Sequence, residues 1–289
     1  MKVSWQWKVR AGEIYRRLAG FHASVRGSGP RKSLPVLVIG SLRSGGGGKT
    51  PVVGWIARTF PDCAILVHPT PDERTMLESD FRGRVFSHAS FPMGWEMARK
   101  AGFSWAISDG GYQDPRLNGG RKILIHDEDL PECPSQLLPF GRWRELAPAS
   151  SRADLHLVRE GLEPFPARNS SGYRWVPHLE GARAPGAVLL ACGVGNPARV
   201  RCDLEGLGCR IVAEHRVRDH GRFSLRRIAR LGAASPGIPW VGTAKDKARW
   251  PRKAGPLVVL ERDWVPSDPA GLAEWIAACR QDWHGPAKS

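Results

Sequence analysis

The sequence predicts an α/β protein of two lobes with a mostly parallel sheet, preceded by an amphipathic helix. Three features support this prediction. Short apolar runs typical of buried strands alternate with helical patterns, which is the order of elements in a parallel sheet covered by helices. A glycine-rich turn connects the first apolar run to a helical segment. Upstream of both, residues 3 to 22 repeat apolar side chains at helical spacing.

Residues 3 to 22 are predicted to form one amphipathic helix. The side chains at spacings of three and four are Trp7, Ala11, Ile14, Leu18 and Phe21. Basic side chains occupy other faces of this helix: Lys8, Arg10, Arg16 and Arg17. Such a helix suits a membrane interface, and it suits equally well an ordinary helix that packs on its own domain. A basic hinge is expected at residues 27 to 32, so the first segment of the chain is residues 1 to 33.

The first lobe is expected to cover residues 34 to 160. Its predicted buried strands are Val36–Ile39, Ala64–Val67, Trp105–Ile107, Ile123–Ile125 and Leu155–Val158. Helical patterns lie between these runs, which favours parallel pairing.

A connector rich in Pro, Gly, Arg and Ser is predicted for residues 161 to 185, with a short hairpin around Tyr173-Arg174-Trp175. The second α/β lobe is expected to cover residues 186 to 289. Its predicted strands are Ala187–Leu190, Ile211–Ala213, Trp240–Gly242 and Val258–Leu260.

The glycine-rich turn predicts a phosphate-binding P-loop. It consists of Gly45, Gly46, Gly47 and Gly48 followed by Lys49 and Thr50. Glycines allow backbone N–H groups to converge on phosphate oxygens, the lysine can reach the β/γ-phosphates, and the threonine can hold Mg²⁺. Arg43 stands where the strict pattern has a glycine. A flexible turn with a solvated lysine is the alternative, but the order strand, loop, helix favours a P-loop NTPase-type lobe.

Asp109 ends an apolar stretch about sixty residues after this loop. An aspartate at the tip of a neighbouring strand is where P-loop enzymes place the carboxylate associated with Mg²⁺. Because Asp-Gly is also a common turn, the metal role depends on the P-loop assignment.

The composition favours an anionic partner. The chain has 289 residues and a formal net charge of +15, which suits nucleic acid, an acidic membrane surface or a phosphorylated substrate. Six scattered cysteines without a Cys-x-x-Cys pair suggest neither a zinc site nor a disulfide scaffold, so a reducing cytosol fits best.

The run from Val38 to Pro51 resembles the P-loop of the tetraacyldisaccharide 4'-kinases, which phosphorylate the lipid A disaccharide precursor. Further segments resemble motifs of this family in the family's order: Asp72-Glu73, Asp109–Gln113, Leu137–Glu145, Cys192–Pro197, Asp219-His220 and Thr243–Asp246. Each short match is weak, but together they cover most of the chain and are specific. The chain is therefore similar to a divergent member of this family.

The resemblance implies roles for particular residues. Asp72 and His220 would handle the proton of the attacking sugar hydroxyl, which is a poor nucleophile without a base. Glu145 would lie near the nucleotide or the metal. From the sequence alone, Asp72 reads as a solvated helix start, His220 as a loop histidine and Glu145 as part of a surface ion pair.

The chain also departs from the family pattern. Gly110 replaces a second aspartate, Gly47 replaces a hydroxyl residue and Ala244 replaces a glutamate. Residues 67 to 71 lead almost directly into Asp72, where the family has a longer segment. These departures put the metal site and part of the active-site wall in question.

The resemblance implies an ATP- and Mg²⁺-dependent lipid kinase at the cytoplasmic face of the inner membrane. Its partners would be the lipid A disaccharide precursor and the anionic membrane surface, with no nucleic acid and no protein partner predicted. A nucleotide-binding homologue with impaired kinase activity and a regulatory role is the first alternative, supported by Gly110 and by the missing segment before Asp72. A nucleic-acid-stimulated P-loop ATPase is the second, supported only by the charge.

Overall fold

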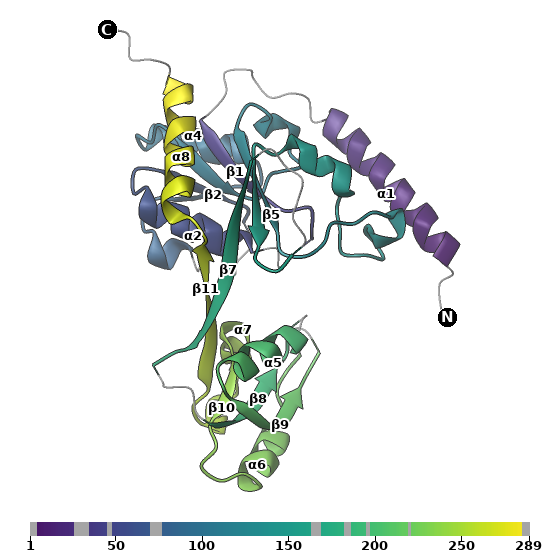
Figure 1. Cartoon of the computed structure of the whole chain (residues 1–289), viewed down its shortest axis with the longest axis vertical. Coiled ribbons are helices and arrows are strands. Elements are labelled where there is room, and N and C mark those ends of the chain that lie inside the picture. Colours follow the sequence, from purple (N-terminus) through teal and green to yellow (C-terminus); the bar gives the residue numbers. More distant parts are fainter. Residues whose placement is uncertain are drawn as a thin grey trace. The chain divides into compact units, whose positions relative to one another are not determined.

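The computed structural model describes residues 5–25, 35–44, 48–69, 77–162, 169–181, 186–194, 197–218 and 221–284. The chain divides into two compact units. Unit 1 consists of Met1–Arg174 and Trp264–Ser289, and unit 2 consists of Trp175–Asp263 (Figure 1). The predicted second lobe, 186 to 289, differs from unit 2 at both ends, because unit 2 begins at Trp175 and the C-terminal helix α8 (Pro269–His284) belongs to unit 1.

The sheet of unit 1 confirms the predicted mostly parallel α/β architecture. Its strands lie in the order β3-β2-β4-β1-β5-β6-β7, and all neighbours in this series pair in parallel. The strands are β1 Val36–Gly40, β2 Ala64–Val67, β3 Val85–Ser87, β4 Ala106–Asp109, β5 Arg121–His126, β6 Leu155–Arg159 and β7 Ser170–Leu179. The residues of β7 from Trp175 onward belong to unit 2. Strand β3 was not predicted, because three half-buried residues at a sheet edge leave little pattern.

Helices cover both faces of this sheet. Alternate strand residues such as Val36 and Val38 belong to one apolar cluster together with Phe91 and Trp95 of α4 (Phe91–Lys100). The intervening residues point to the other face, where α2 (Lys49–Thr59) contacts β1, β2 and β4. Short 3-10 helices complete the unit: η1 Pro115–Leu117, η2 Pro134–Gln136 and η3 Ala147–Arg152.

The predicted hairpin around Tyr173 is wrong. Residues Ser170–Leu179 form the single strand β7, which pairs in parallel with β6 through the register His156↔Ser170 to Arg159↔Tyr173. Tyr173 is fully buried, and its hydroxyl donates to the backbone oxygen of His126 at 3.2 Å. Polar and glycine residues around this strand suggested a connector, but burial of one aromatic ring fixes it as a strand.

Unit 2 contains a smaller parallel sheet. Its strands β8 (Ala187–Cys192), β9 (Arg210–Arg216), β10 (Trp240–Thr243) and β11 (Val258–Pro266) lie in the order β11-β10-β8-β9. Its helices are α5 Pro197–Gly206, α6 Leu225–Ala233, α7 Ala244–Arg249 and the 3-10 helix η4 Arg252–Ala254. Alternate residues of β8 join two different apolar clusters, one with Leu204 of α5 and one with Ile228 of α6. Helices α5 and α6 therefore cover opposite faces of this sheet.

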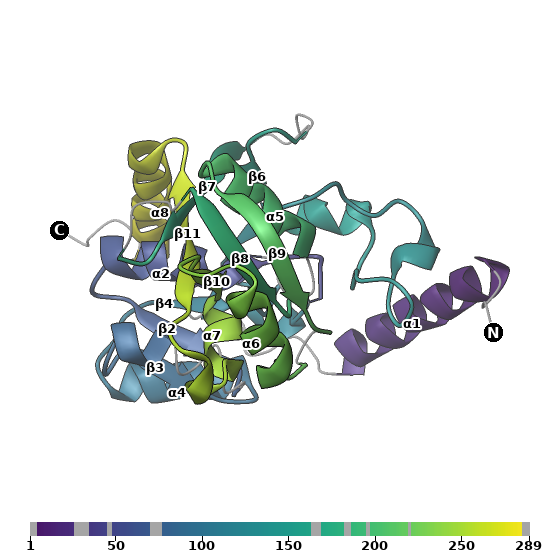
Figure 2. The same cartoon turned by 90° about the horizontal axis from the view of Figure 1, so that it is seen from below.

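Helix α1 (Trp5–Val25) packs on its own unit through Gly12 and Tyr15, which are not members of the predicted apolar stripe. It lies against η2, as Figures 1 and 2 show, and a Cβ on Gly12 would come 1.9 Å from the backbone oxygen of Pro134. Tyr15 packs against the core cluster of unit 1. Two members of the predicted stripe remain exposed, Trp7 at 54% and Ile14 at 53%. Among the described residues, no helix is both long and apolar enough to span a bilayer.

Two buried histidines stack between β5 and β6. His126 Nε2 lies 2.8 Å from His156 Nδ1, and the ring centroids are 5.1 Å apart. Burial, with a contribution from the neighbouring His156, lowers the pKa of His126 to about 3. Burial also lowers the pKa of His156. The folded chain therefore keeps the His126 ring neutral under mildly acidic conditions.

Because these histidines are buried and neutral, we expect the stability of the fold to decrease in acid. An unfolded histidine titrates near pH 6.5, so below that value the unfolded chain binds more protons than the folded chain and stability falls as pH decreases. The expected loss is roughly 1.4 kcal/mol for each pH unit between the unfolded and folded pKa of His126. Urea unfolding of the parent chain and of His126→Gln, between neutral pH and pH ~4.5, measures it. Equal acid sensitivity of the two proteins would contradict the prediction.

Candidate active site

The start of the predicted P-loop is held by the Leu137–Glu145 segment. After β1, the backbone N–H of Ser44 donates to Arg142 O at 2.8 Å, and that of Arg144 donates to Leu42 O at 2.7 Å. Between these bonds Arg43 forms an antiparallel bridge with Trp143. The P-loop segment and the Leu137–Glu145 segment, which resemble two separate motifs of the family, thus pair with each other. The departure at Arg43 has a local reason, because its side chain forms a 2.8 Å ion pair with Glu128.

The end of the loop opens α2. Gly48 is the N-cap with φ of 70°, in the left-handed region that favours glycine. Lys49 is the first helical residue and is half-buried. Backbone N–H groups of a first helical turn have no partner within the helix and favour bound phosphate. The predicted cradle residues Gly45, Gly46 and Gly47 lie outside the described residues.

Thr50 and Asp109 meet at the carboxyl edge of the sheet. Asp109 ends β4, in register with Ile39 of the adjacent β1. Thr50 Oγ1 donates to Asp109 Oδ2 at 2.6 Å, although the two residues are 59 positions apart. Asp109 is only 5% exposed. The structure therefore brings together the two residues that the sequence analysis proposed as metal ligands.

The donor set at this contact suits a hard cation. A threonine hydroxyl and a carboxylate are oxygen ligands, which Mg²⁺ prefers, and Mg²⁺ usually takes only one or two protein ligands alongside phosphate oxygens and waters. Among the described residues there is no group of three or more His, Cys, Asp or Glu side chains that could hold a metal ion by themselves. Thr50 and Asp109 thus fit a nucleotide-associated Mg²⁺.

A cavity of about 320 Å³ lies beside Asp109. Lys49 and Asp109 line it, and so do side chains that the sequence analysis did not assign to the site, among them Arg43, His68 and Phe91. The His68 ring stands edge-on to Phe91 with centroids 4.7 Å apart. His68 directly follows β2. Its position at the end of a buried strand was the feature of the sequence that could have identified it as a site residue. This cavity provides a cationic and aromatic wall beside the phosphate-binding loop.

Glu145 does not line that cavity, but it is connected to it. Gln113, which does line it, donates from Nε2 to Ser41 O at 3.3 Å and to Glu145 Oε2 at 3.1 Å. Arg152 Nη2 donates to the same carboxylate oxygen. Glu145 therefore helps to hold the end of β1 through Gln113, and its proposed proximity to a nucleotide stays a prediction.

Gly110 directly follows Asp109 with φ of 99°. An added Cβ would find its nearest neighbour at 3.9 Å, so space is available, but this backbone conformation is strained for other residues. The local backbone accounts for glycine at a position where the resembling family has an aspartate.

The proposed proton-handling residues, Asp72 and His220, lie outside the described residues. Next to the latter, Gly221 O accepts a hydrogen bond from Arg249 Nη1 at 3.4 Å. Arg249 Nη2 also donates to Gly193 O at 2.8 Å and to Asp246 Oδ1 at 3.1 Å. The arginine thereby connects three of the segments that carry the family resemblance.

Asp246 is the centre of this arrangement in unit 2. It is fully buried (0% exposed) and accepts hydrogen bonds from the backbone N–H groups of Gly193 and Thr243 and from the Thr243 hydroxyl. Thr243 and Asp246 also form the capping box of α7. A fully partnered buried carboxylate stabilises local structure, so we assign the Thr243–Asp246 motif a structural role.

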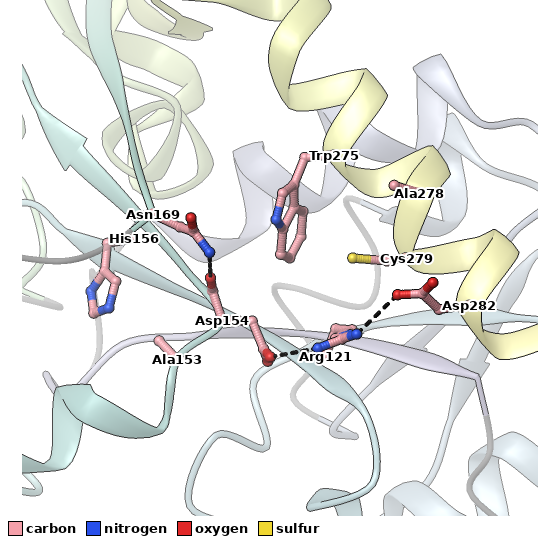
Figure 3. Close-up of a pocket in the computed structure, with 9 residues that line it drawn as sticks. All are labelled: Arg121, Ala153, Asp154, His156, Asn169, Trp275, Ala278, Cys279 and Asp282. Carbon is pink, nitrogen blue, oxygen red and sulfur yellow. Dashed lines mark hydrogen bonds and ion pairs between the residues drawn. The ribbon is translucent and has the colours of Figure 1, made fainter.

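A second cavity, also of about 320 Å³, lies at the opposite edge of the unit 1 sheet (Figure 3). Arg121 begins β5, Asp154 precedes β6, and both lie at the amino ends of the strands. Arg121 pairs with Asp154 at 3.1 Å and with Asp282 of α8 at 3.0 Å, as Figure 3 shows. These pairs attach α8 to the sheet. The two cavities have the same volume, so volume does not indicate which is the active site. Of the two, the cavity beside Lys49 and Asp109 combines a phosphate-binding loop with magnesium-type ligands.

The fold and this site define a P-loop protein: a buried strand, a glycine-rich loop, a helix that opens with Lys-Thr, and an aspartate on the neighbouring strand. A family model described as tetraacyldisaccharide-1-P 4'-kinase matches residues 67–280. The match spans most of the chain, and the chain belongs to this family.

Named relatives agree with the family match. A tetraacyldisaccharide 4'-kinase of Nitrobacter winogradskyi is 27% identical over 279 residues, covering 83% of this chain and 82% of the relative. One of Methylorubrum populi is 26% identical and covers 92% of each chain. The crystal structure of LpxK from Aquifex aeolicus in complex with ATP has a TM-score of 0.70 at 18% identity, covering 95% of this chain and 99% of that one. The structural similarity shows a shared fold.

We expect Arg249 to make a measurable contribution to the stability of the fold. Arg249→Ala removes the cation beside the fully buried Asp246 and is expected to cost about 3 kcal/mol of unfolding free energy. Arg252→Ala, on an exposed side chain of the adjacent 3-10 helix, is the matched control and should leave stability unchanged. Denaturant unfolding of the three proteins is the measurement. Similar stabilities of the two variants would show that Asp246 does not require its arginine.

Proposed function

We propose that this chain transfers the γ-phosphate of ATP to the 4'-hydroxyl of an acylated glucosamine disaccharide 1-phosphate in lipid A biosynthesis. The observation that carries the proposal is the contact between Thr50 and Asp109 at the end of the P-loop, within a chain that belongs to the tetraacyldisaccharide-1-P 4'-kinase family. The fold shared with an ATP-bound LpxK supports ATP as the donor.

Each part of the loop has a proposed task. Gly45, Gly46, Gly47 and Gly48 cradle the phosphates, and Lys49 neutralises charge on the β/γ-phosphates as a point cation. Thr50 and Asp109 are the ligands proposed for Mg²⁺, which when bound offsets the negative charge that develops on the phosphates. Because Thr50 already contacts Asp109, the two oxygens need little rearrangement.

We assign the sugar hydroxyl proton to Asp72 and His220, on the basis of the family resemblance. A carboxylate that orients an imidazole lets the imidazole take a proton at neutral pH. Glu145 is proposed to act near the nucleotide through its connection to Gln113 and the end of β1.

The first test is Lys49→Ala. We expect turnover of the disaccharide with ATP and Mg²⁺ to fall roughly 10²–10³-fold, as for removal of one preorganised donor to transition-state charge. Thermal melting should be unchanged, since Lys49 is only half-buried and fills no core position. Lys100→Ala, on an exposed helical lysine, is the control. Activity of Lys49→Ala equal to that of the control would refute the P-loop assignment.

The second test concerns Asp72 and His220. Loss of a positioned general base typically lowers the rate about 10²–10⁴-fold. Because two members of one catalytic unit are not additive, Asp72→Ala/His220→Ala should resemble the slower single variant, with ATP affinity little changed. Full additivity of the two losses would show that the residues act in separate steps.

We also propose peripheral association with the cytoplasmic face of the inner membrane through residues 1 to 26. Its support is that α1 packs through Gly12 and Tyr15, while two members of the predicted stripe, Trp7 and Ile14, are exposed. Exposed apolar groups flanked by arginines suit an interfacial helix.

Trp7→Ser/Ile14→Ser is expected to weaken flotation with anionic vesicles while leaving ATP binding intact. Met93→Ser/Met97→Ser is the matched control, because these two side chains are equally apolar and exposed on α4. An equal loss of flotation in both variants would indicate unspecific apolar adhesion and would contradict the role of α1.

Gly110 supports one alternative, a nucleotide-binding homologue with impaired kinase activity and a regulatory role. With glycine at this position, the site lacks the second aspartate of the resembling family, and the φ of 99° favours glycine there. ATP binding without phosphate transfer to the disaccharide would favour this alternative over the kinase.

A further inference from the structure

Helix α6 of unit 2 presents arginines to solvent on the side opposite its buried face. Ser224 caps the helix, and Ile228 is buried in the apolar cluster beneath it. Arg226 and Arg230 each lie two positions from Ile228, about 200° around the helix axis. Both side chains are exposed, and so are those of Arg222 and Arg227. We call these four arginines, with Leu225, the α6 basic surface.

The segment that carries this surface has no acidic side chain. Residues 221 to 245 contain no Asp or Glu. Three other arginines of unit 2 have carboxylate partners: Arg201 with Glu214, Arg249 with Asp246 and Arg262 with Asp203. Within the part of the chain that the structure describes, the four arginines of the α6 basic surface form no such pair. Arg252 and Lys253 of η4, which packs against α6, are also exposed and add to the positive charge.

A neighbouring buried group responds to this uncompensated charge. His215 of β9 is 4% exposed, and burial lowers its pKa. The positive charge of Arg227 lowers that pKa further. The charge of Arg227, one member of the α6 basic surface, therefore acts on a buried group inside the unit.

Apolar groups accompany the arginines. Leu225 is 43% exposed at the start of α6, and Ala229 and Ala233 are exposed on the same side of the helix. Arginine stems can lie along an apolar surface while their guanidinium groups reach phosphates. We infer that the α6 basic surface is a binding surface for anionic phospholipid, separate in sequence from α1 and contributed by unit 2.

Nucleic acid is the competing anionic partner, and the composition of the surface disfavours it. Proteins that bind single strands combine basic grooves with aromatic side chains on which bases stack. The α6 basic surface has arginines and small or aliphatic side chains, but no aromatic residue among Leu225–Ala233. A lipid surface requires only positive charge with apolar side chains that enter the headgroup region. The inference does not depend on the kinase reaction.

The test uses the full chain and Arg226→Gln/Arg230→Gln, with Arg82→Gln/Lys100→Gln as the matched control. The control removes the same charge from exposed side chains of unit 1 that have no acidic partner among the described residues. Partitioning onto mixed phosphatidylglycerol–phosphatidylcholine vesicles and onto pure phosphatidylcholine is measured at low and high salt. We expect roughly 30-fold weaker partitioning of the α6 variant at low salt, because each arginine near an anionic surface contributes about 1 kcal/mol. High salt should remove most of this difference.

Both pairs are also placed in the Trp7→Ser/Ile14→Ser background, so that loss of α1 binding is distinguished from loss of the α6 basic surface. The α6 effect should persist there, with ATP binding and melting unchanged in every variant. Equal weakening by the α6 and control pairs would overturn the inference, since net charge alone would then explain binding. Unchanged vesicle binding together with lost binding to a fluorescent RNA oligonucleotide would assign the surface to nucleic acid and also overturn it.

Discussion

The hydrogen bond between Thr50 and Asp109 requires three elements to meet at one point. Strand β4 must lie beside β1 so that Asp109 reaches the edge where the loop begins, and α2 must start there with Thr50 in its first turn. Parallel pairing satisfies both conditions, because it places the carboxyl ends of neighbouring strands on one side of the sheet. The cavity, its cationic wall and the proposed metal ligands all depend on this arrangement.

Segments with no obvious chemistry of their own hold that arrangement in place. The Leu137–Glu145 segment pairs with the start of the loop through backbone hydrogen bonds, and Gln113 connects the end of β1 to Glu145. In unit 2, Asp246 and Arg249 perform a comparable task for the loops at Gly193 and Gly221. Motifs that resemble a catalytic family are therefore partly motifs of loop geometry. Their substitution would move reactive groups without removing any of them.

Arginine serves two physical purposes in this strongly basic chain. Paired arginines such as Arg249 and Arg121 join segments through carboxylates and backbone oxygens, where their charge is compensated locally. The arginines on α6 form no ion pair among the described residues and are exposed to solvent, which suits an anionic surface. The net charge of +15 is thus only partly offset by ion pairs within the described residues, and α6 carries several of the arginines that these pairs do not include.

The sequence alone determined the strand–loop–helix order, the parallel α/β class and the candidates Lys49, Thr50 and Asp109, because these depend on local pattern and short motifs. The tertiary structure decided what depends on distant contacts. Burial of Tyr173 made β7 a strand where local composition suggested a connector with a hairpin. The close approach at Gly12 decided which face of α1 packs, although its apolar periodicity pointed to another face. Periodicity shows that a helix has an apolar side, but only packing shows what that side contacts.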